Sequence, residues 1–287
     1  MRGSRPLSLA LLVATVAAAA AAASPAEPEA FPTPCSMRVE SELFVAGDEQ
    51  PVARSLTLFH EGVAWDFLEL PAAEAADAAE MQLAEIVLQD PARERVVVIN
   101  PVRRLKTEIP TIRLERLSVS LARWARESDD RLVRWAGGPD FAEGMLEEEG
   151  RLELAGPRVR YAVAHVEAPS AEAAETYRRF ADTAILLKAL LQPGGIPPFP
   201  RLALNQRLGE TSSIPAEVTL EIEPRAGLLA GGTDRYRCMH RSHPRLLASD
   251  LARLDEARSH VAAADSVGLA AFMARPDADE ADETRQD

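Results

Sequence analysis

Apolar and polar residues alternate along the first third of the chain. Residues 37–45 place mostly apolar side chains at odd positions and mostly charged side chains at even positions. A period of two is typical of a strand with one face in the core and one in water. Runs at 56–60 and 63–67 flank Glu61-Gly62, a two-residue link that predicts a tight hairpin. Further strands are predicted at 85–89, 95–100 and 105–109, so this part of the chain predicts an antiparallel meander.

The period changes after residue 110. Leu114, Leu117, Leu121 and Trp124 recur at helical spacing, which predicts a core-packing helical stretch over 111–136. The alanine-rich and acidic segment 71–81 fits either a loop or a short helix.

The second half of the chain mixes strands and helices. Strands are predicted at 150–155 and 158–166, across Gly156-Pro157, and again at 216–223 and 234–242. Ser170 is a good N-cap for a helix that runs to Gln192. Shorter helices are expected at 201–208 and from Ser249-Asp250 to Val261. We therefore expect a single α+β domain over 35–273, followed by an acidic, disordered tail at 274–287.

The N-terminus has the layout of a secretory signal peptide. Arg2 and Arg5 precede an apolar run that ends in alanines, which predicts cleavage after about Ala23. An uncleaved membrane anchor is the alternative, but alanine contributes little to membrane insertion. Residues 24–34 form a proline-rich leader. The sequence therefore predicts an exported protein, periplasmic or extracellular.

The negative net charge of the protein argues against some classes of binding partner. Its net charge is -13, and removal of Arg2 and Arg5 with the signal peptide takes it to -15. A protein with this charge is repelled by nucleic-acid backbones and by anionic lipid surfaces, so we predict no nucleic-acid partner.

The chain has two cysteines, Cys35 and Cys238. In an exported protein two cysteines usually form a disulfide, which here would close a loop of about 200 residues. The alternative is two separate buried thiols.

Candidate chemistry is sparse. Cys238, His240 and His243 are the residue types that bind zinc or copper, but on a strand His243 points away from the other two. We therefore predict no metal and no cofactor. No nucleophile elbow, phosphate loop or dinucleotide motif is present, so we predict no catalytic residues and no enzyme. A hydrolase remains an alternative only if His165 or His260 meets an acid and a nucleophile in the fold.

One stretch resembles a known class of protein. Residues 53–67, 85–91, 97–101 and 106–109, with turns at Asp90-Pro91 and Asn100-Pro101, resemble the exported lipoprotein carriers typified by bacterial LolA and LppX. The whole chain is also similar to secreted proteins of planctomycetes. The resemblance implies a curved antiparallel sheet, here of about eight strands, with amphipathic helices packed on one face. The helices at 111–136 and after Ser170 depart from a plain carrier.

A curved sheet covered by helices can enclose an apolar ligand. The expected lining comes from the sheet and from the covering helix: Leu58, Val63, Trp65, Phe67 and Leu88, with Tyr177, Phe180 and Leu187. We therefore expect a non-enzymatic protein of the cell envelope that binds a lipid or another apolar ligand. The alternative is a structural component with a solid core that binds another envelope protein.

Overall fold

The computed structural model describes residues 35–72, 80–141, 144–148, 150–223 and 233–274. The expected signal peptide (1–23), the leader (24–34) and, apart from Ala274, the acidic tail (274–287) lie outside these residues, as do 73–79 of the undecided segment. All elements below belong to one unit, Pro34–Asp287.

The described part of the chain contains twelve strands in one sheet. They are β1 (Met37–Val45), β2 (Ala53–His60), β3 (Val63–Pro71), β4 (Met81–Asp90), β5 (Arg95–Asn100), β6 (Leu105–Pro110), β7 (Met145–Glu148), β8 (Arg151–Gly156), β9 (Val159–Glu167), β10 (Ser213–Ile222), β11 (Asp234–His243) and β12 (Asp265–Ser266). Their order in the sheet is β12-β6-β5-β4-β3-β2-β1-β11-β10-β9-β8-β7.

The predicted meander is confirmed. Strands β1 to β6 pair in sequence order and are antiparallel throughout. Glu61 and Gly62 both have positive φ, 53° and 77°, as the β2–β3 hairpin turn requires. Strand β11 pairs with β1, and β12 pairs with β6 in parallel. The sheet is therefore large, open and mostly antiparallel.

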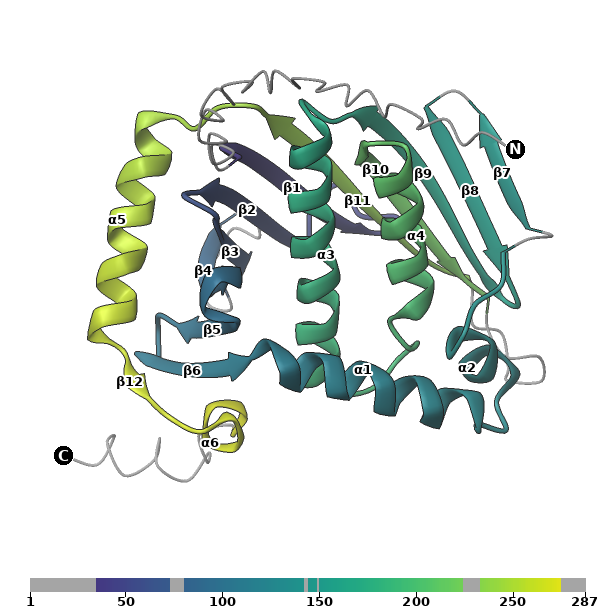
Figure 1. Ribbon diagram of the computed structural model, residues 1–287, viewed down its shortest axis with the longest axis horizontal. Coiled ribbons are helices and arrows are strands. Elements are labelled where there is room, and N and C mark those ends of the chain that lie inside the picture. The colour runs from purple at the N-terminus through teal and green to yellow at the C-terminus, as the bar shows by residue number, and fades with distance from the viewer. Residues whose placement is uncertain (1–34, 73–79, 142–143, 149, 224–232, 275–287) are drawn as a thin grey trace, which may run out of the picture. The chain divides into compact units, whose positions relative to one another are not determined.

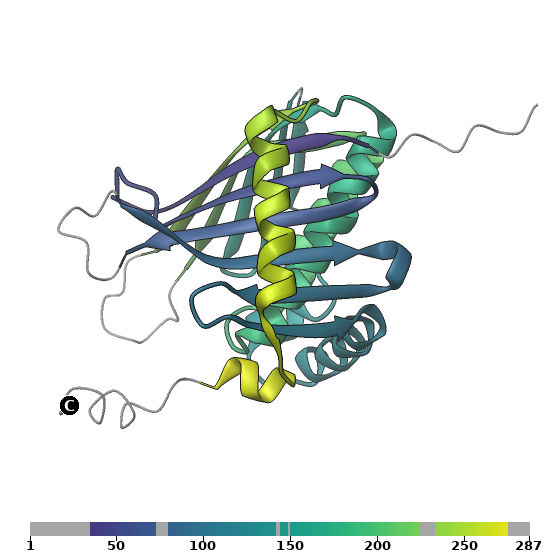
Figure 2. The same ribbon diagram turned by 90° about the vertical axis from the view of Figure 1, so that its left-hand side faces the viewer.

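Helices cover the two faces of the sheet. The described residues form six α-helices, α1 (Thr111–Arg126), α2 (Arg131–Ala136), α3 (Ala171–Leu191), α4 (Phe199–Glu210), α5 (Ala248–Ala263) and α6 (Leu269–Met273), and a short 3-10 helix, η1 (Pro91–Arg93). Helices α3 and α4 lie on one face, which we call the inner face, and α5 crosses the other, the outer face (Figures 1 and 2).

The inner face packs against three sets of helical residues. Met37, Phe59 and Ile214 contact Ala173 and Tyr177 of α3. Farther along the sheet, strands β8 to β10 pack on α2 and α4, and strands β4 to β6 pack on α1, α3 and α6. The helix predicted from Ser170 is confirmed, because the Ser170 hydroxyl accepts a hydrogen bond from the Ala173 amide at 3.1 Å.

The outer face carries a second core beneath α5. Leu58, Trp65 and Phe67 pack there against Leu254 and Ala257. Arg253 of α5 also stacks over the Phe67 ring at 4.8 Å. Helix α5 begins slightly earlier than predicted, and the Leu247 amide donates to the Asp250 carboxylate at 2.7 Å.

The fold class is therefore α+β, but two details of the expectation are wrong. The sheet has twelve described strands in place of about eight. Ten of them overlap strands predicted individually from the sequence, whereas β7 is exposed at all four positions and β12 has only two residues, so neither produces an apolar pattern. Helices also lie on both faces. Consecutive buried residues such as 86–90 and 96–99 require cover on both sides of the sheet.

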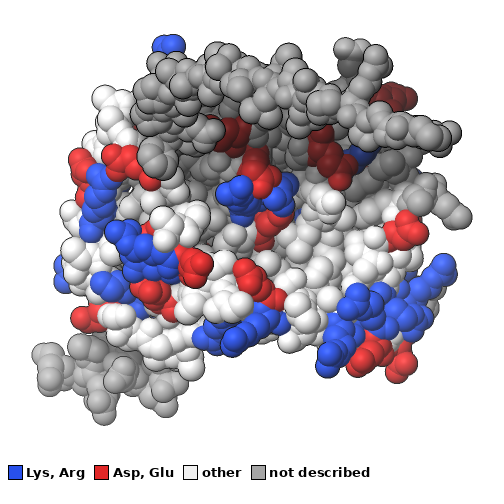
Figure 3. All heavy atoms as spheres, viewed as in Figure 1, with Lys and Arg blue, Asp and Glu red and all other residues white. Residues whose placement is uncertain are grey.

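Charged side chains of both signs are interspersed over the face shown in Figure 3, and basic side chains gather at its lower right, over α1 and α2. No helix in the described ranges is long and apolar enough to cross a membrane.

The outer core yields a stability test on α5. Leu254 is fully buried and Leu251, on the same helix, is 45% exposed. We expect Leu254→Ala to lower the free energy of unfolding by about 2–5 kcal/mol, through lost burial and a cavity. Leu251→Ala is the control and changes it by less than about 0.5 kcal/mol. Urea unfolding measures both, and equal effects would contradict the packing of α5 on the sheet.

Candidate functional site

A cavity of about 510 Å³ lies between the inner face, α3 and the first turn of α1. This volume is within the usual range for small-molecule sites, roughly 300–1,000 Å³. Its walls come from the ends of the β2–β3 and β4–β5 hairpins and from one side of α3. The residues that line it include Phe59, Val63, Ala64, Gln89, Val96, Thr111, Thr176, Phe180 and Thr183.

The floor of the cavity is aromatic and held in place by the helix. The Phe59 and Phe180 rings meet edge to face, 5.5 Å apart, and Tyr177 lies 6.4 Å from Phe180. The Gln89 side-chain amide, which is buried, donates to the Phe180 carbonyl at 3.1 Å. This bond fixes α3 over β4 at the level of the floor.

The rim of the cavity is charged, and part of it is paired. Arg93 donates to Asp90 at 2.7 Å. Burial alone would raise the pKa of Asp90. The hydrogen bonds and the charge of Arg93 together lower it by more than burial raises it, so the net shift of the pKa is downward. An apolar floor with an ionised rim suits a ligand that has an apolar part and a polar end.

A row of polar residues crosses the inner face beside this floor. The strand registers align His240 with Ser41, Ser41 with Ser55, Ser55 with Leu68, and Leu68 with Glu85. We call His240, Ser41, Ser55 and Glu85 the inner polar row. Ser41 Oγ lies 2.8 Å from His240 Nδ1, and His240 Nε2 is buried without a partner among the described residues.

Burial shifts the ionisation of this region. It lowers the pKa of His240 to about 3, with help from the charge of Arg201, so this imidazole is neutral. Burial also raises the pKa of Asp66 to about 6, although hydrogen bonds from Thr57 (2.7 Å) and Ser55 act in the opposite direction. The pKa of Glu85 is raised by burial and lowered in part by Lys188.

The inner face is packed around Met37 and Phe59 and is partly exposed towards the other end of the strands. Met37 and Phe59 are 0% and 2% exposed. Protein atoms surround Asp66 and His240 on nearly all sides, yet both keep part of their surface accessible to water. Figure 2 shows the strand ends beyond this level reaching past the helices, towards the left of the view. Asp66, Glu85 and His240 are therefore half-buried and not fully enclosed.

Arg201 faces the same region from α4. It is three and seven residues before Leu204 and Leu208, which are buried against the sheet. Its charge acts on Tyr161, Tyr177, Cys238 and His240. In the part of the chain that the structure describes, no carboxylate pairs with this half-buried arginine.

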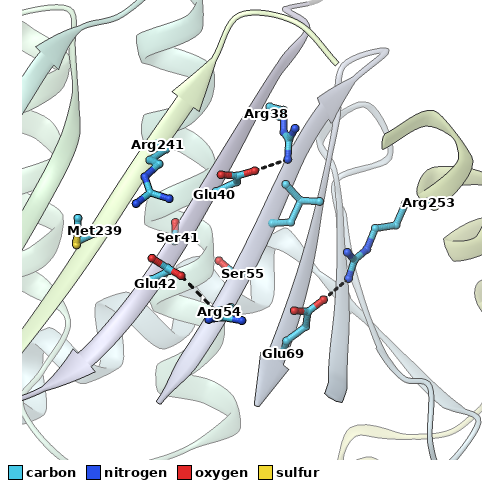
Figure 4. A pocket seen from close by; sticks show the side chains of 11 residues that line it. Arg38, Glu40, Ser41, Glu42, Arg54, Ser55, Glu69, Met239, Arg241 and Arg253 are labelled. Atoms are coloured by element: carbon cyan, nitrogen blue, oxygen red, sulfur yellow. Dashed lines mark hydrogen bonds and ion pairs between the residues drawn. The ribbon is translucent and has the colours of Figure 1, made fainter. Parts of the chain in front are cut away.

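A second cavity, of about 330 Å³, lies on the outer face beside α5 and is charged (Figure 4). Its charges largely neutralise one another: Arg38 pairs with Glu40, Arg54 with Glu42 at 3.3 Å, and Arg253 with Glu69 at 2.6 Å. Arg253 belongs to α5 and Glu69 to β3, so the ion pair between them holds the helix against the sheet.

The eight predicted lining residues do not share one face. Leu58, Trp65, Phe67 and Leu88 pack under α5 on the outer face. Tyr177 and Leu187 are buried in the cores under α3, and only Val63 and Phe180 of the eight line the 510 Å³ cavity. Sequence reasoning missed Phe59 and Ala64, which are immediate neighbours of predicted positions on β2 and β3. It also missed Val96 on β5, a strand from which no lining residue was predicted.

The predicted disulfide is absent, since Cys35 and Cys238 are both free thiols. Cys238 lies opposite Leu43, near the far end of β1 from Cys35. Leu43 is eight residues after Cys35, so at about 3.3 Å per residue the two cysteines lie roughly 26 Å apart along the strand direction. A disulfide needs Cα atoms within about 7 Å. Burial raises the pKa of both thiols.

The histidines singled out for a hydrolase lie apart. His165 is on β9, and His260 on α5 lies 3.9 Å from Glu256. Ser259, next to His260, donates to the Asp255 carbonyl. Within the described ranges no group of three or more metal-binding side chains converges. Searches against protein-family models and against the curated proteins find no match to this chain.

Asp66 yields a test of the buried polar region. Its pKa is about 6 in the folded protein and about 3.8 ordinarily, so between pH 4 and 6 the folded state binds more protons than the unfolded state. The free energy of unfolding therefore falls as pH rises through this window. We expect Asp66→Asn to remove this fall and to gain up to about 3 kcal/mol relative to wild type between pH 4 and 7.

Chemical denaturation at several pH values measures this difference, and the carbon-13 shift of the Asp66 carboxyl group reports its titration directly. A constant difference between Asp66→Asn and wild type from pH 4 to 7 would show that the carboxyl group is not desolvated.

Proposed function

We propose that the protein is a non-enzymatic component of the cell envelope that binds an apolar or amphiphilic ligand, such as a lipid acyl chain, in the 510 Å³ cavity. The cavity itself is the observation that carries this proposal. It is large enough for a small ligand, and its floor presents Phe59, Val63 and Phe180. Export of the protein remains a prediction from residues 1–23.

The physical basis of binding is burial of hydrocarbon. Each methylene group moved from water to an apolar site contributes about 0.8 kcal/mol. The polar end of the ligand stays at the rim, where Glu115 and Arg179 are exposed and Arg95 is half-buried. A floor held by the Gln89–Phe180 hydrogen bond is preorganised, which lowers the entropic cost of binding.

The polar residues of the inner face support a binding role over a hydrolytic one. Ser41 and His240 are hydrogen-bonded as a nucleophile and base would be, but a pKa of about 3 makes His240 a poor proton acceptor. No carboxylate of the described residues orients Nε2 of this imidazole, as a catalytic triad requires. The other alternative is a structural protein with a solid core, and this alternative does not account for the 510 Å³ cavity.

Filling the cavity tests the proposal. Thr176 lies on α3 and lines the cavity, so Thr176→Trp places an indole in the space of the ligand. We expect this variant to bind a fluorescent long-chain fatty acid about tenfold more weakly or worse, because apolar contact surface is lost. The measurement is a fluorescence titration, with native mass spectrometry of the purified protein for co-purified lipid.

The control is Ala252→Trp, which adds the same side chain to an exposed position of α5 on the outer face. It should bind the probe like wild type. No binding by wild type, together with no co-purified lipid, would refute the proposed function. Equal weakening by both variants would show that the probe binds elsewhere.

A further inference from the structure

Helix α1 exposes large apolar side chains that no described element covers. Ile112 is 50% exposed, Val119 67% and Trp124 56%. The opposite side of the helix is buried through Leu114 and Ala125, so α1 is anchored to the protein by one face. The exposed residues therefore form a fixed surface on a helix that is packed against the rest of the protein.

Four arginines share this exposed surface: Arg113, Arg116, Arg123 and Arg126. Within the described ranges none of them forms an ion pair with an acidic residue. Of the 21 other arginines in the described ranges, eleven also lack such an ion pair and ten form one, at positions 38, 54, 93, 95, 178, 179, 207, 235, 253 and 258. Helix α1 is distinguished by carrying four arginines without an ion pair on one 16-residue helix.

The apolar and basic residues alternate along one stripe of the helix. Ile112, Arg116, Val119, Arg123 and Arg126 follow one another at steps of three or four residues, which places them on one side of an α-helix. Arginine can extend its charged end past a neighbouring apolar side chain. The stripe therefore presents apolar groups flanked by cationic groups, over the area where Figure 3 shows basic side chains at the lower right.

The apolar surface continues beside the stripe. A groove of about 430 Å³ lies between α1 and the segment that follows α3, and its walls include Leu121, Trp124, Ala189 and Ile196. Trp124 lines this groove and is also exposed. An indole at the border of an apolar surface is the arrangement that favours the headgroup region of a bilayer.

We propose that the exposed face of α1 docks the protein onto a bilayer that contains anionic lipids. Acidic headgroups pair with the four arginines, while Ile112, Val119 and Trp124 enter the boundary between headgroups and acyl chains. An acidic protein surface or nucleic acid satisfies the charges but leaves these apolar side chains in water. The acidic tail of this chain, residues 275–287, contains no large apolar residue and fails for the same reason.

The net charge of -13 does not oppose this docking at contact. At physiological ionic strength charges farther away than about 8 Å are largely screened, so the arginines of α1 dominate the local interaction. The prediction of repulsion from anionic lipids, drawn from net charge alone, therefore fails at this face under the proposal. Thr111 and Glu115 of α1 also line the 510 Å³ cavity, so α1 contributes to both the docking surface and the cavity wall.

The first experiment measures cosedimentation of the full chain with vesicles of phosphatidylcholine, with and without 30% phosphatidylglycerol, at about 0.1 M salt. We expect binding to the anionic vesicles and about thirtyfold weaker binding for Arg116→Gln/Arg123→Gln, since each arginine near the surface contributes about 1 kcal/mol. The control is Arg207→Gln/Arg258→Gln, which removes the same charge from ion-paired arginines. Residues 1–34 are common to all variants, so differences between variants report on α1.

The second experiment follows tryptophan emission, because Trp124 is the exposed one of the three tryptophans, while Trp65 is buried and Trp135 half-buried. Anionic vesicles should shift the emission to shorter wavelength, and Trp124→Phe should abolish the shift. Equal weakening by the two double variants, equal binding to both vesicle types, or binding without a Trp124-dependent shift would overturn the proposal. None of these readouts requires a ligand in the cavity, so the two proposals fail independently.

Discussion

The fold depends on burying both faces of strands β2 to β5. Leu58 and Phe59 are adjacent and both buried, so their side chains enter cores on opposite sides of the sheet. A sheet of this kind is stable only when each face is covered. Helices α3 and α1 cover one face and α5 the other, and the long connections between strands exist to supply them. The cavity and the inner polar row lie where the helices cover the inner face incompletely. The charged cleft lies where an ion pair holds α5 on the outer face.

The two faces differ in what they bury. The outer face closes over Trp65 and Phe67, and its buried Asp250 lies 3.6 Å from Arg38. The ion pair between Arg253 and Glu69 also holds α5 there. On the inner face Asp66, His240 and Glu85 are half-buried and lie next to the aromatic floor of the cavity. Desolvation of such groups costs free energy, and a fold built for stability alone would replace them with apolar residues. The inner face is therefore where the proposed ligand binding is most consistent with the chemistry.

Sequence reasoning recovered most of the strands and helices, but not β7, β12 or α6, and it did not recover the site. The alternation in β1 and the Glu61-Gly62 turn are local properties, and both are correct in the structure. Which face α3 covers is a long-range property. In β2 and β3 both faces are apolar, so the pattern did not distinguish Leu58 from Phe59 or Val63 from Ala64, and residues from both sides were assigned to one cavity. The pairing of Cys35 with Cys238 failed for a related reason, because chain composition contains no information on which end of β1 meets β11.

The position of β1 in the sheet has a consequence for how the chain folds. Its neighbours are β2, which follows directly, and β11, which begins at Asp234. Until that late segment is available, one edge of β1 has unpaired backbone groups and the middle of the sheet is missing. Contacts this distant in sequence form slowly, so the two halves of the sheet join late in folding. A chain with this topology completes its sheet only after nearly all of its residues have been synthesised.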